Sequence, residues 1–261
     1  MEILGYILSL LIGVSLGLIG SGGSILAVPI LVYFFGVTPE NATTHSLFIV
    51  GITSVIASYK HHRLGNLKIK EAVVFGIPSV IVLLLTRKFL LPAIPEIVFQ
   101  TDAFTFSKHT LIMMVFSVLM IIAALSMVQK KSVPKTGSAS SLRLIFIGLA
   151  VGLVTGFLGA GGGFLIVPAL LFYARLNLKN AIATSVFIIT VNSLIGFLGD
   201  LINKVQFDKM LLAEVSTMAI AGMFAGLALS KKIDGKKLKP VFGWFVLTMG
   251  VFIILKEVFH L

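Results

Sequence analysis

The sequence contains no cysteine and little charge. Without cysteine it can form neither a disulfide nor a thiolate metal site. Only 12% of its 261 residues are charged and 57% are hydrophobic, whereas about a quarter of the residues in a soluble domain are charged. Such a chain has too little polar surface to stay in water, and its composition predicts a polytopic membrane protein.

Signatures of nucleotide binding and of intramembrane catalysis are also missing. The chain has no Gly-Lys-Ser/Thr P-loop, and a Gly-x-Gly-x-x-Gly motif would need a glycine where Ile25 stands. The predicted helices have no His-Glu-x-x-His zinc motif and no pair of buried aspartates. Gly199-Asp200 lacks the preceding glycine pattern of aspartyl intramembrane proteases. We therefore expect neither a cofactor nor a metal and no enzymatic activity, and keep an intramembrane enzyme only as an alternative.

The net charge of +11 does not indicate nucleic acid as a partner. The lysines and arginines lie in short clusters between apolar runs, which is the positive-inside pattern of a protein embedded in a lipid bilayer. With residues 60–70 placed in the cytoplasm, every strongly basic loop falls on the same side of the membrane. The loops predicted inside are 60–70, 130–143, 175–179 and 231–239; both termini and residues 92–107 and 199–208 are predicted outside. Arg87 and Lys88 are the exception, at an outer helix end where long side chains can extend to the interface.

An internal repeat with an offset of 139 residues organises the chain. A glycine-rich stretch at 17–29 recurs at 156–168, and the match continues without a gap into the helices that follow. Repeats of this kind define an architecture before any single motif does. The repeated positions include Gly13, Gly17, Gly20, Gly22, Gly23 and Pro29, which match Gly152, Gly156, Gly159, Gly161, Gly162 and Pro168.

Each half is predicted to hold about five helical segments. An odd number makes the two halves enter the membrane from opposite sides, so we predict an all-α polytopic membrane protein built from two inverted-topology repeats. The first repeat covers 1–130, a cytoplasmic linker 131–141, and the second repeat 142–261. In the first repeat a helix over 71–91 is followed by an exposed loop at 92–107.

The second segment of each half is short. Residues 24–35 would form a helix of about 18 Å, less than the roughly 30 Å of the hydrocarbon core. These segments and their mates at 164–174 can either span or re-enter the membrane, which gives 8 to 10 segments crossing or entering it.

The two glycine-rich breaks are the first candidate substrate site. Each break ends one helix and starts another, and the first N–H groups of a helix lack intrahelical partners and favour an anion. The alternative is that these glycines only allow close helix packing, which suits Gly13 and Gly17. The candidate residues are Gly20, Ser21, Gly22, Gly23 and Ser24, and Gly159, Gly161, Gly162 and Gly163.

The third segment of each half supplies the second set of candidates. Polar residues inside spans are costly and usually face a bundle interior or a wet cavity. Ordinary interhelical hydrogen bonding, with helix capping near Asn41 and Asn180, is the alternative. The candidates are Asn41, His45, Ser46 and Thr53, with their repeat mates Asn180, Thr184, Ser185 and Asn192.

His45 and Asp200 are ionisable residues to which the sequence assigns different surroundings. Because His45 lies well inside a predicted helix without a nearby Arg or Lys on the third helices, it is the candidate to become cationic beside an anion and to carry a coupled proton. Asn41, one turn earlier, can orient its ring, and a purely structural role is the alternative. Asp200 ends a helix on the outer side and is expected to be solvated, with a gate as the alternative.

The doubled Gly-x-Gly-Gly stretch with its proline, each copy followed by Asn-Ala and a polar helix, resembles the TauE/SafE family of sulfite exporters. The resemblance implies a multi-pass plasma-membrane protein with seven or eight spans that moves sulfur-containing anions such as sulfite or organosulfonates. We expect a secondary exporter with alternating access around a midplane site at the glycine breaks, driven by an ion gradient or by the gradient of the substrate, with protons as the candidate coupling ion. A passive anion channel is the alternative, and the exact substrate and the oligomeric state stay open.

Overall fold

A computed structural model describes residues 2–20, 23–100, 105–128, 140–229 and 235–259, and within them the chain is almost entirely helical. The helices of the first half are α1 (Glu2–Ile19), α2 (Ser24–Phe35), α3 (Pro39–Arg63), α4 (Ile69–Leu85), the π-helix η1 (Thr86–Leu90), α5 (Leu91–Ala93) and α6 (Lys108–Val128). Those of the second half are α7 (Ser141–Leu158), α8 (Gly163–Phe172), α9 (Leu178–Ile202), α10 (Lys209–Leu229) and α11 (Gly235–Phe259). The predicted all-α membrane architecture is confirmed.

Seven helices in the described part of the chain are long and apolar enough to cross a bilayer. Three shorter apolar helices, at Ile3–Leu18, Ser24–Phe35 and Gly163–Phe172, complete the ten segments expected from the sequence. The long ones are Pro39–Arg63, Ile69–Ala93, Lys108–Val128, Ser141–Leu158, Leu178–Ile202, Lys209–Leu229 and Pro240–Phe259.

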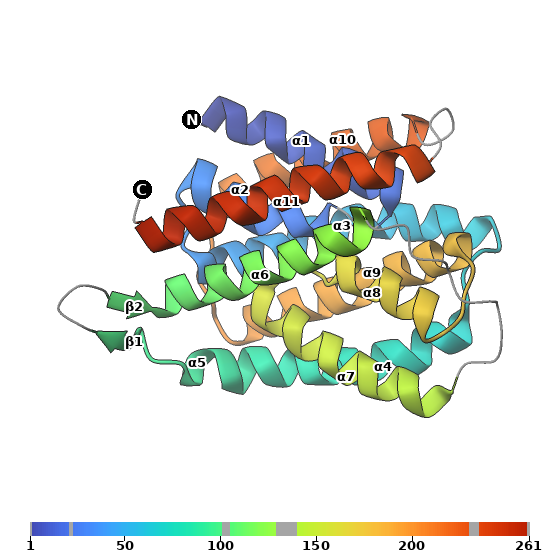
Figure 1. The fold of residues 1–261 in the computed structure, drawn as a ribbon, viewed down its shortest axis with the longest axis horizontal. Coiled ribbons are helices and arrows are strands. Elements are labelled where there is room, and N and C mark those ends of the chain that lie inside the picture. Colours follow the sequence, from blue (N-terminus) through green and yellow to red (C-terminus); the bar gives the residue numbers. More distant parts are fainter. Residues whose placement is uncertain (1, 21–22, 101–104, 129–139, 230–234, 260–261) are drawn as a thin grey trace.

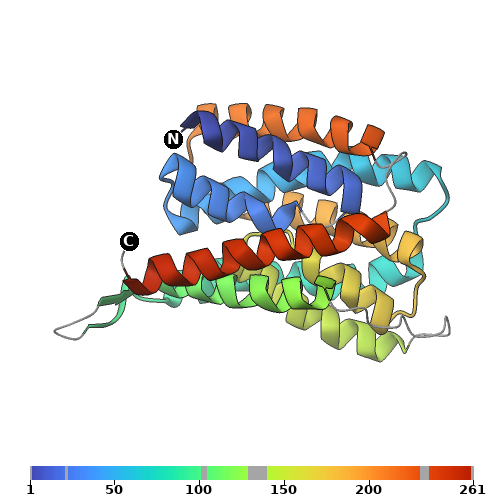
Figure 2. The same cartoon turned by 45° about the horizontal axis from the view of Figure 1, so that its top comes forward.

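The long helices run roughly along one common direction (Figure 1). Helix α1 begins and helix α11 ends near the same end of the molecule, and a hairpin of strands β1 (Ile97–Gln100) and β2 (Thr105–Ser107) projects from that end (Figures 1 and 2). The loop between α3 and α4 lies at the opposite end (Figure 1). This arrangement agrees with the prediction that both termini and residues 92–107 share one side of the membrane.

Two details differ from the sequence-based expectation. The region predicted as an exposed loop contains the antiparallel pair β1–β2, although the side chains of β1 are exposed as expected. The fourth segment does not end as a regular α-helix, because it continues through η1 into α5. The amide of Leu91 donates to the carbonyl of Thr86, five residues back, and Pro92, which follows, has no amide to donate.

Glycines allow two pairs of parallel helices to touch backbone to backbone. A Cβ on Gly152 of α7 would lie 2.3 Å from the carbonyl oxygen of Ser79 in α4, and one on Gly156 would lie 2.8 Å from that of Leu83. In the equivalent pair, a Cβ on Gly13 of α1 would lie 1.8 Å from the carbonyl oxygen of Ala219 in α10. The packing interpretation therefore holds for Gly13 and for its mate Gly152.

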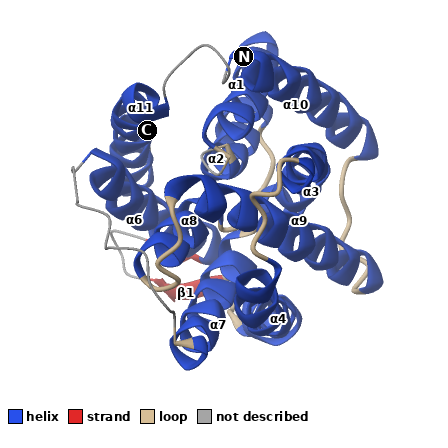
Figure 3. Ribbon diagram, turned by 90° about the vertical axis from the view of Figure 1, so that its right-hand side faces the viewer, coloured by secondary structure: helices blue, strands red, loops and turns tan. Residues whose placement is uncertain are grey.

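Each of these pairs joins the two halves of the sequence. Helix α1 packs on α10 and α4 on α7, while α3 packs on α9 and α6 on α11. Seen end-on, α3, α8 and α9 lie toward the middle, with α6 and α11 on one side and α4 and α7 below (Figure 3). If the halves are exchanged, this set of pairs maps onto itself, as a pseudo-two-fold relation between repeats requires.

Candidate functional site

The second glycine break is shaped by three residues with left-handed backbone. Gly159, Gly161 and Gly162 have φ angles of 62°, 62° and 72° between the end of α7 and the start of α8. A Cβ on Gly159 would lie 2.3 Å from the Cβ of Thr43 in α3. Glycine is needed here for its conformation and for the close approach of α3.

Gly161 lies where α3 and α9 meet. A Cβ on it would lie 2.9 Å from Val50 of α3 and 2.7 Å from the Oγ of Ser193 in α9. The start of α8 at Gly163 is buried, so its N-terminal amides face the interior of the bundle and not the lipid. The second break thus brings a helix N-terminus to the centre of the molecule.

The first break contacts the same stripe of α9. Gly20 has a φ of 77° and faces Ile182 and Val186 of α9. A Cβ added to Gly20 would lie 2.4 Å from the Cγ2 of Ile182. Because Ile182, Val186, Ile189 and Ser193 share one helix face, the two breaks lie about 10 Å apart along α9. Ser21 and Gly22 lie outside the described residues.

Gly23 and Ser24 complete the first break on the side of α2. A Cβ on Gly23 would lie 2.1 Å from the carbonyl oxygen of Ile12 in α1, so close packing accounts for this glycine. Ser24 begins α2 and is fully buried. As at the second break, the short helix starts inside the protein.

The polar residues of α3 and α9 are not gathered in one place. Since α3 and α9 run antiparallel, His45 lies near the Asp208 carbonyl, whereas Thr184 accepts a hydrogen bond from the amide of Lys68 in the α3–α4 loop. These contacts lie toward opposite ends of the bundle. Asn180 lies one turn before Thr184, at the same end of α9. The backbone amide of Asn180 donates to the Oδ1 of Asn177, so Asn177 and not Asn180 caps the helix.

Buried polar atoms without partners lie near the middle of α3 and α9. Among the described residues, the Ser46 and Ser193 hydroxyls and the Asn192 Oδ1 atom have no hydrogen-bond partner. Ser193 borders Gly161, and Ser46 lies between Thr43 and Val50 on the face of α3 that contacts the second break.

The neighbouring polar groups are already paired. The Nδ2 of Asn192 donates to the Ser79 hydroxyl at 2.8 Å. Thr53 and Ser185 donate to backbone carbonyls of their own helices, at 2.6 Å to Ile49 and 2.8 Å to Ile182. Of the predicted site residues on α3 and α9, Ser46 and Asn192 therefore have free hydrogen-bonding capacity near the centre.

His45 is buried and held by two carbonyls. Its Nδ1 lies 2.7 Å from the carbonyl oxygen of Asn41 and its Nε2 lies 3.3 Å from that of Asp208, with Phe207 edge-on to the ring. Asn41 does orient the ring, through its backbone. A neutral imidazole can donate to one of these carbonyls and a protonated one to both.

A buried ion pair beside the second break corrects two expectations from the sequence. Asp200 is only 3% exposed and Arg87 only 6% exposed, although the first was expected to be solvated and the second to extend toward the interface. The Nε of Arg87 donates to Oδ1 of Asp200 at 2.7 Å, and its Nη2 donates to Oδ2. The pair is bidentate, the strongest geometry for a guanidinium and a carboxylate.

The same guanidinium reaches α3 and α7. Its Nη1 donates to the carbonyl oxygen of Gly156 at 3.1 Å, and its Nη2 lies 3.0 Å from the Thr44 hydroxyl and 3.3 Å from that of Thr43. Since Thr43 also contacts Gly159, Arg87 lies next to the second break. The structure thus places Arg87 beside the second break, in the role of a buried cation that the sequence analysis gave to His45.

Sequence reasoning missed this pair because each residue was assigned to a helix end. A signal was present: one arginine and one aspartate stand in apolar segments of different halves, and charges within spans tend to pair. The π-helix could not be foreseen, yet it is the element that carries Arg87.

A further acidic and imidazole cluster lies at the hairpin end. Ligand atoms of Glu40, Glu96 and His109 all lie within 4.8 Å of one another, and Glu40 Oε2 is 2.8 Å from His109 Nε2. Glu96 also faces the Nζ of Lys108 at 3.9 Å. The ammonium competes for this carboxylate, and we assign no metal to the cluster.

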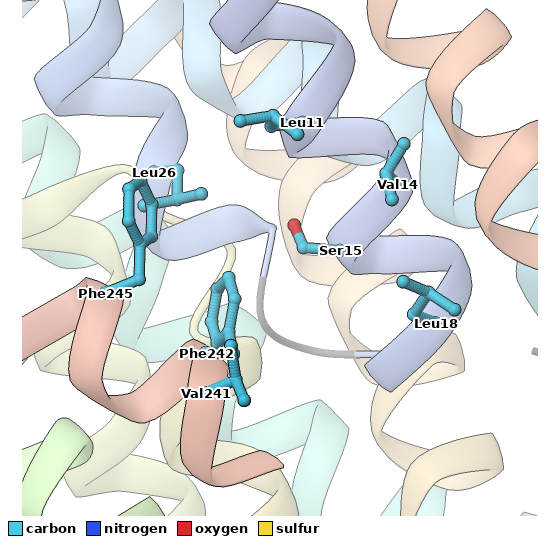
Figure 4. A pocket seen from close by; sticks show the side chains of 8 residues that line it. All are labelled: Leu11, Val14, Ser15, Leu18, Leu26, Val241, Phe242 and Phe245. Atoms are coloured by element: carbon cyan, nitrogen blue, oxygen red, sulfur yellow. The ribbon is translucent and has the colours of Figure 1, made fainter. Parts of the chain in front are cut away.

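The pocket beside the first break has a different character. Its volume is about 280 Å³, and Ser15 contributes its one hydroxyl, which already donates to the carbonyl of Ile12 (Figure 4). An anion would lose its hydration there without compensation, so the pocket does not suit a charged substrate. Its lining residues are Leu11, Val14, Ser15, Leu18, Leu26, Val241, Phe242 and Phe245.

The sequence matches one known protein family over nearly its whole length. The family model described as sulfite exporter TauE/SafE matches residues 6–253. A probable membrane transporter protein of Xylella fastidiosa is 29% identical, covering 94% of this chain and 91% of its own length. Probable membrane transporter proteins of Methanocaldococcus jannaschii and Bacillus subtilis are each 26% identical, covering 95% and 97% of this chain and 94% and 97% of their own lengths.

Proposed function

Because the chain belongs to the TauE/SafE sulfite exporter family, we propose that it is a secondary transporter of a small sulfur-containing anion such as sulfite or an organosulfonate. That it is a multi-pass membrane transporter follows from the family, from the names of its relatives and from its seven long apolar helices. The family and the named relatives are membrane transporters and not enzymes, in agreement with the expectation from the sequence.

The observation that carries the anion proposal is the burial of Arg87 beside the second glycine break. A desolvated anion needs compensating positive charge. Arg87 supplies a full charge, which Asp200 balances in this structure, and the N-terminus of α8 supplies partial charges within the same region. The unpartnered Ser193 hydroxyl at Gly161 adds a donor there. We propose that the substrate binds among these groups.

The pairing of helices supports alternating access as the transport cycle. Every strong helix pair joins one half to the other, so a movement of one half against the other would act on α3 and α9, where both breaks lie. We propose that the two halves rock around this centre, as inverted repeats, in the cytoplasmic membrane, with export as the physiological direction.

The test is flux through the purified protein in liposomes. Radiolabelled or dye-reported uptake is measured for sulfite, thiosulfate, methanesulfonate and acetate, against protein-free liposomes. We expect the sulfur oxyanions to move faster than acetate, and an imposed proton gradient to drive at least one of them uphill. Movement that only dissipates gradients would identify a passive channel, and no flux of any sulfur oxyanion would refute the proposal.

A further inference from the structure

We propose that Asp200 and the transported anion alternate as the partner of Arg87, and that a proton taken up by Asp200 accompanies each anion. This inference rests on the proposed anion transport and adds its coupling mechanism. It assigns to the buried pair a role that the sequence analysis gave to His45.

The first argument is the shape of the contact. Asp200 presents two oxygens to Nε and Nη2 of Arg87. Sulfite and sulfonates also present two oxygens in one plane, so they fit the same edge of the guanidinium. Arg87 stays in position during the exchange, because its Nη1 is held separately by the carbonyl of Gly156.

The second argument is the balance of charge around the pair. Among the described residues, the side chains that hydrogen-bond to Asp200 are Arg87 from η1 and Thr44 from α3, and of these two only Arg87 is charged. When Arg87 and Asp200 are both ionised, the pair has no net charge. A monovalent anion that took the place of Asp200 would leave one net negative charge in a buried site, which is strongly unfavourable. A proton on the displaced carboxylate restores neutrality.

The third argument is that Thr44 suits either state of Asp200. Its hydroxyl donates to Oδ2 at 2.8 Å and can accept from Arg87 at 3.0 Å. A hydroxyl can donate to a carboxylate or, after rotation, accept from a carboxylic acid. The protonated Asp200 therefore keeps a partner after it leaves Arg87.

The exchange has a defined stoichiometry. The carboxylate of Asp200 gains one proton from water on the side where the site is open, and one anion binds Arg87. When the anion leaves, Asp200 loses the proton and returns to Arg87. Anion and proton thus cross in the same direction, one to one, and the cycle is electroneutral for a monovalent anion. Export by this cycle is therefore driven by the outward gradient of the anion, and an inward proton gradient opposes it.

Methanesulfonate is the probe, since its charge is constant between about pH 5 and 8. The first measurement is proton uptake by wild-type protein in weakly buffered detergent solution. We expect one proton per bound anion, and an affinity that rises about tenfold for each unit that the pH falls over the proton-linked range. Binding without proton uptake would overturn the coupling while leaving anion transport intact.

Variants then locate the proton and the anion. Asp200→Asn should bind methanesulfonate without proton uptake, within about twofold across the pH range, and more tightly than wild type at pH 8, because the competitor is gone. Arg87→Gln/Asp200→Asn removes both charges, avoids an unpaired arginine and should not bind the anion. If this double variant binds like wild type, Arg87 is only structural.

Two matched controls complete the test. Lys88→Gln removes the exposed neighbouring cation and should leave binding and proton uptake unchanged. His45→Gln should keep one proton per anion. A loss of proton uptake in His45→Gln but not in Asp200→Asn would assign the coupled proton to His45 and reject the role of Asp200. If wild type binds neither methanesulfonate nor sulfite, the proposed function fails together with its coupling.

Discussion

Gly161 has a left-handed backbone and neighbours from two helices at the centre of the protein. Its φ is 62°, and an added Cβ would lie 2.7 Å from the Ser193 hydroxyl and 2.9 Å from Val50. Gly36 has the similar φ of 66° with nothing within 4 Å of its Cβ position. Substituting each glycine by alanine therefore separates the effect of backbone strain, present at both, from the effect of crowding, present only at Gly161.

We predict that Gly161→Ala lowers anion flux at least tenfold while the protein still inserts into the membrane. Gly36→Ala should show only the strain, about 1–2 kcal/mol of stability, and keep its flux. Flux in liposomes and thermal unfolding in detergent measure the two effects. Equal flux for both variants would show that the space at Gly161 does not matter to transport.

At this scale the sequence predicted backbone requirements better than side-chain partners. The doubled glycines marked Gly159, Gly161 and Gly162 because glycine adopts their left-handed conformation without the strain that a side chain adds, and a repeat makes that preference visible. Arg87 and Asp200 are 113 positions apart and come from different halves, so their contact depends on how η1 and α9 pack. No local pattern encodes that distance.

Helices α4 and α7 form an element pair whose spacing depends on glycine. Gly148 and Gly152 of α7 each face a backbone carbonyl of α4, at 2.5 Å from Phe75 and 2.3 Å from Ser79 for an added Cβ. In α4 itself, a Cβ on Gly76 would meet only Ile188, at 3.8 Å. A methyl group at the first two sites must push the helices apart.

Gly152→Ala is expected to lower the free energy of unfolding by about 1–3 kcal/mol or more, since overpacking cannot be relieved by a rigid backbone. Gly76→Ala, the control on the partner helix, should change it by less than about 1 kcal/mol. Thermal or denaturant unfolding of the purified variants provides the comparison. Equal stability of the two would contradict the backbone contact between α4 and α7.

The ten main helical segments could be predicted because each is a long apolar run, and because the repeat marks the first three segments of each half twice. The hairpin and η1 were not predicted, and both fall in 86–107, outside the ungapped stretches that were matched between the halves. Strands as short as β1 and β2, and a π-helix such as η1, leave no distinct sequence pattern when no repeated copy supports them. Prediction therefore worked where long apolar runs or the repeat marked an element, and failed between them.

For the molecule as a whole, the main prediction is which end of the helix bundle faces the cytoplasm. The hairpin is predicted outside and the α3–α4 loop inside. The chain has no cysteine, so single cysteines can be introduced at the exposed positions Gln100 and Leu64. A membrane-impermeant maleimide added to intact cells should label Gln100→Cys and should label Leu64→Cys only after permeabilisation, with the unmodified chain as the blank. Labelling of both from one face would contradict the predicted topology.

The pairing of α1 with α10 also has a consequence for synthesis. Gly13 and Gly17 of α1 lie directly against the backbone of α10, and α10 begins at Lys209. At about 5–20 residues per second, a ribosome needs roughly 10–40 s to reach it. During that interval Gly13 and Gly17 of α1 lack their native contacts with α10, so α1 completes its packing only after α2 to α9 have been synthesised.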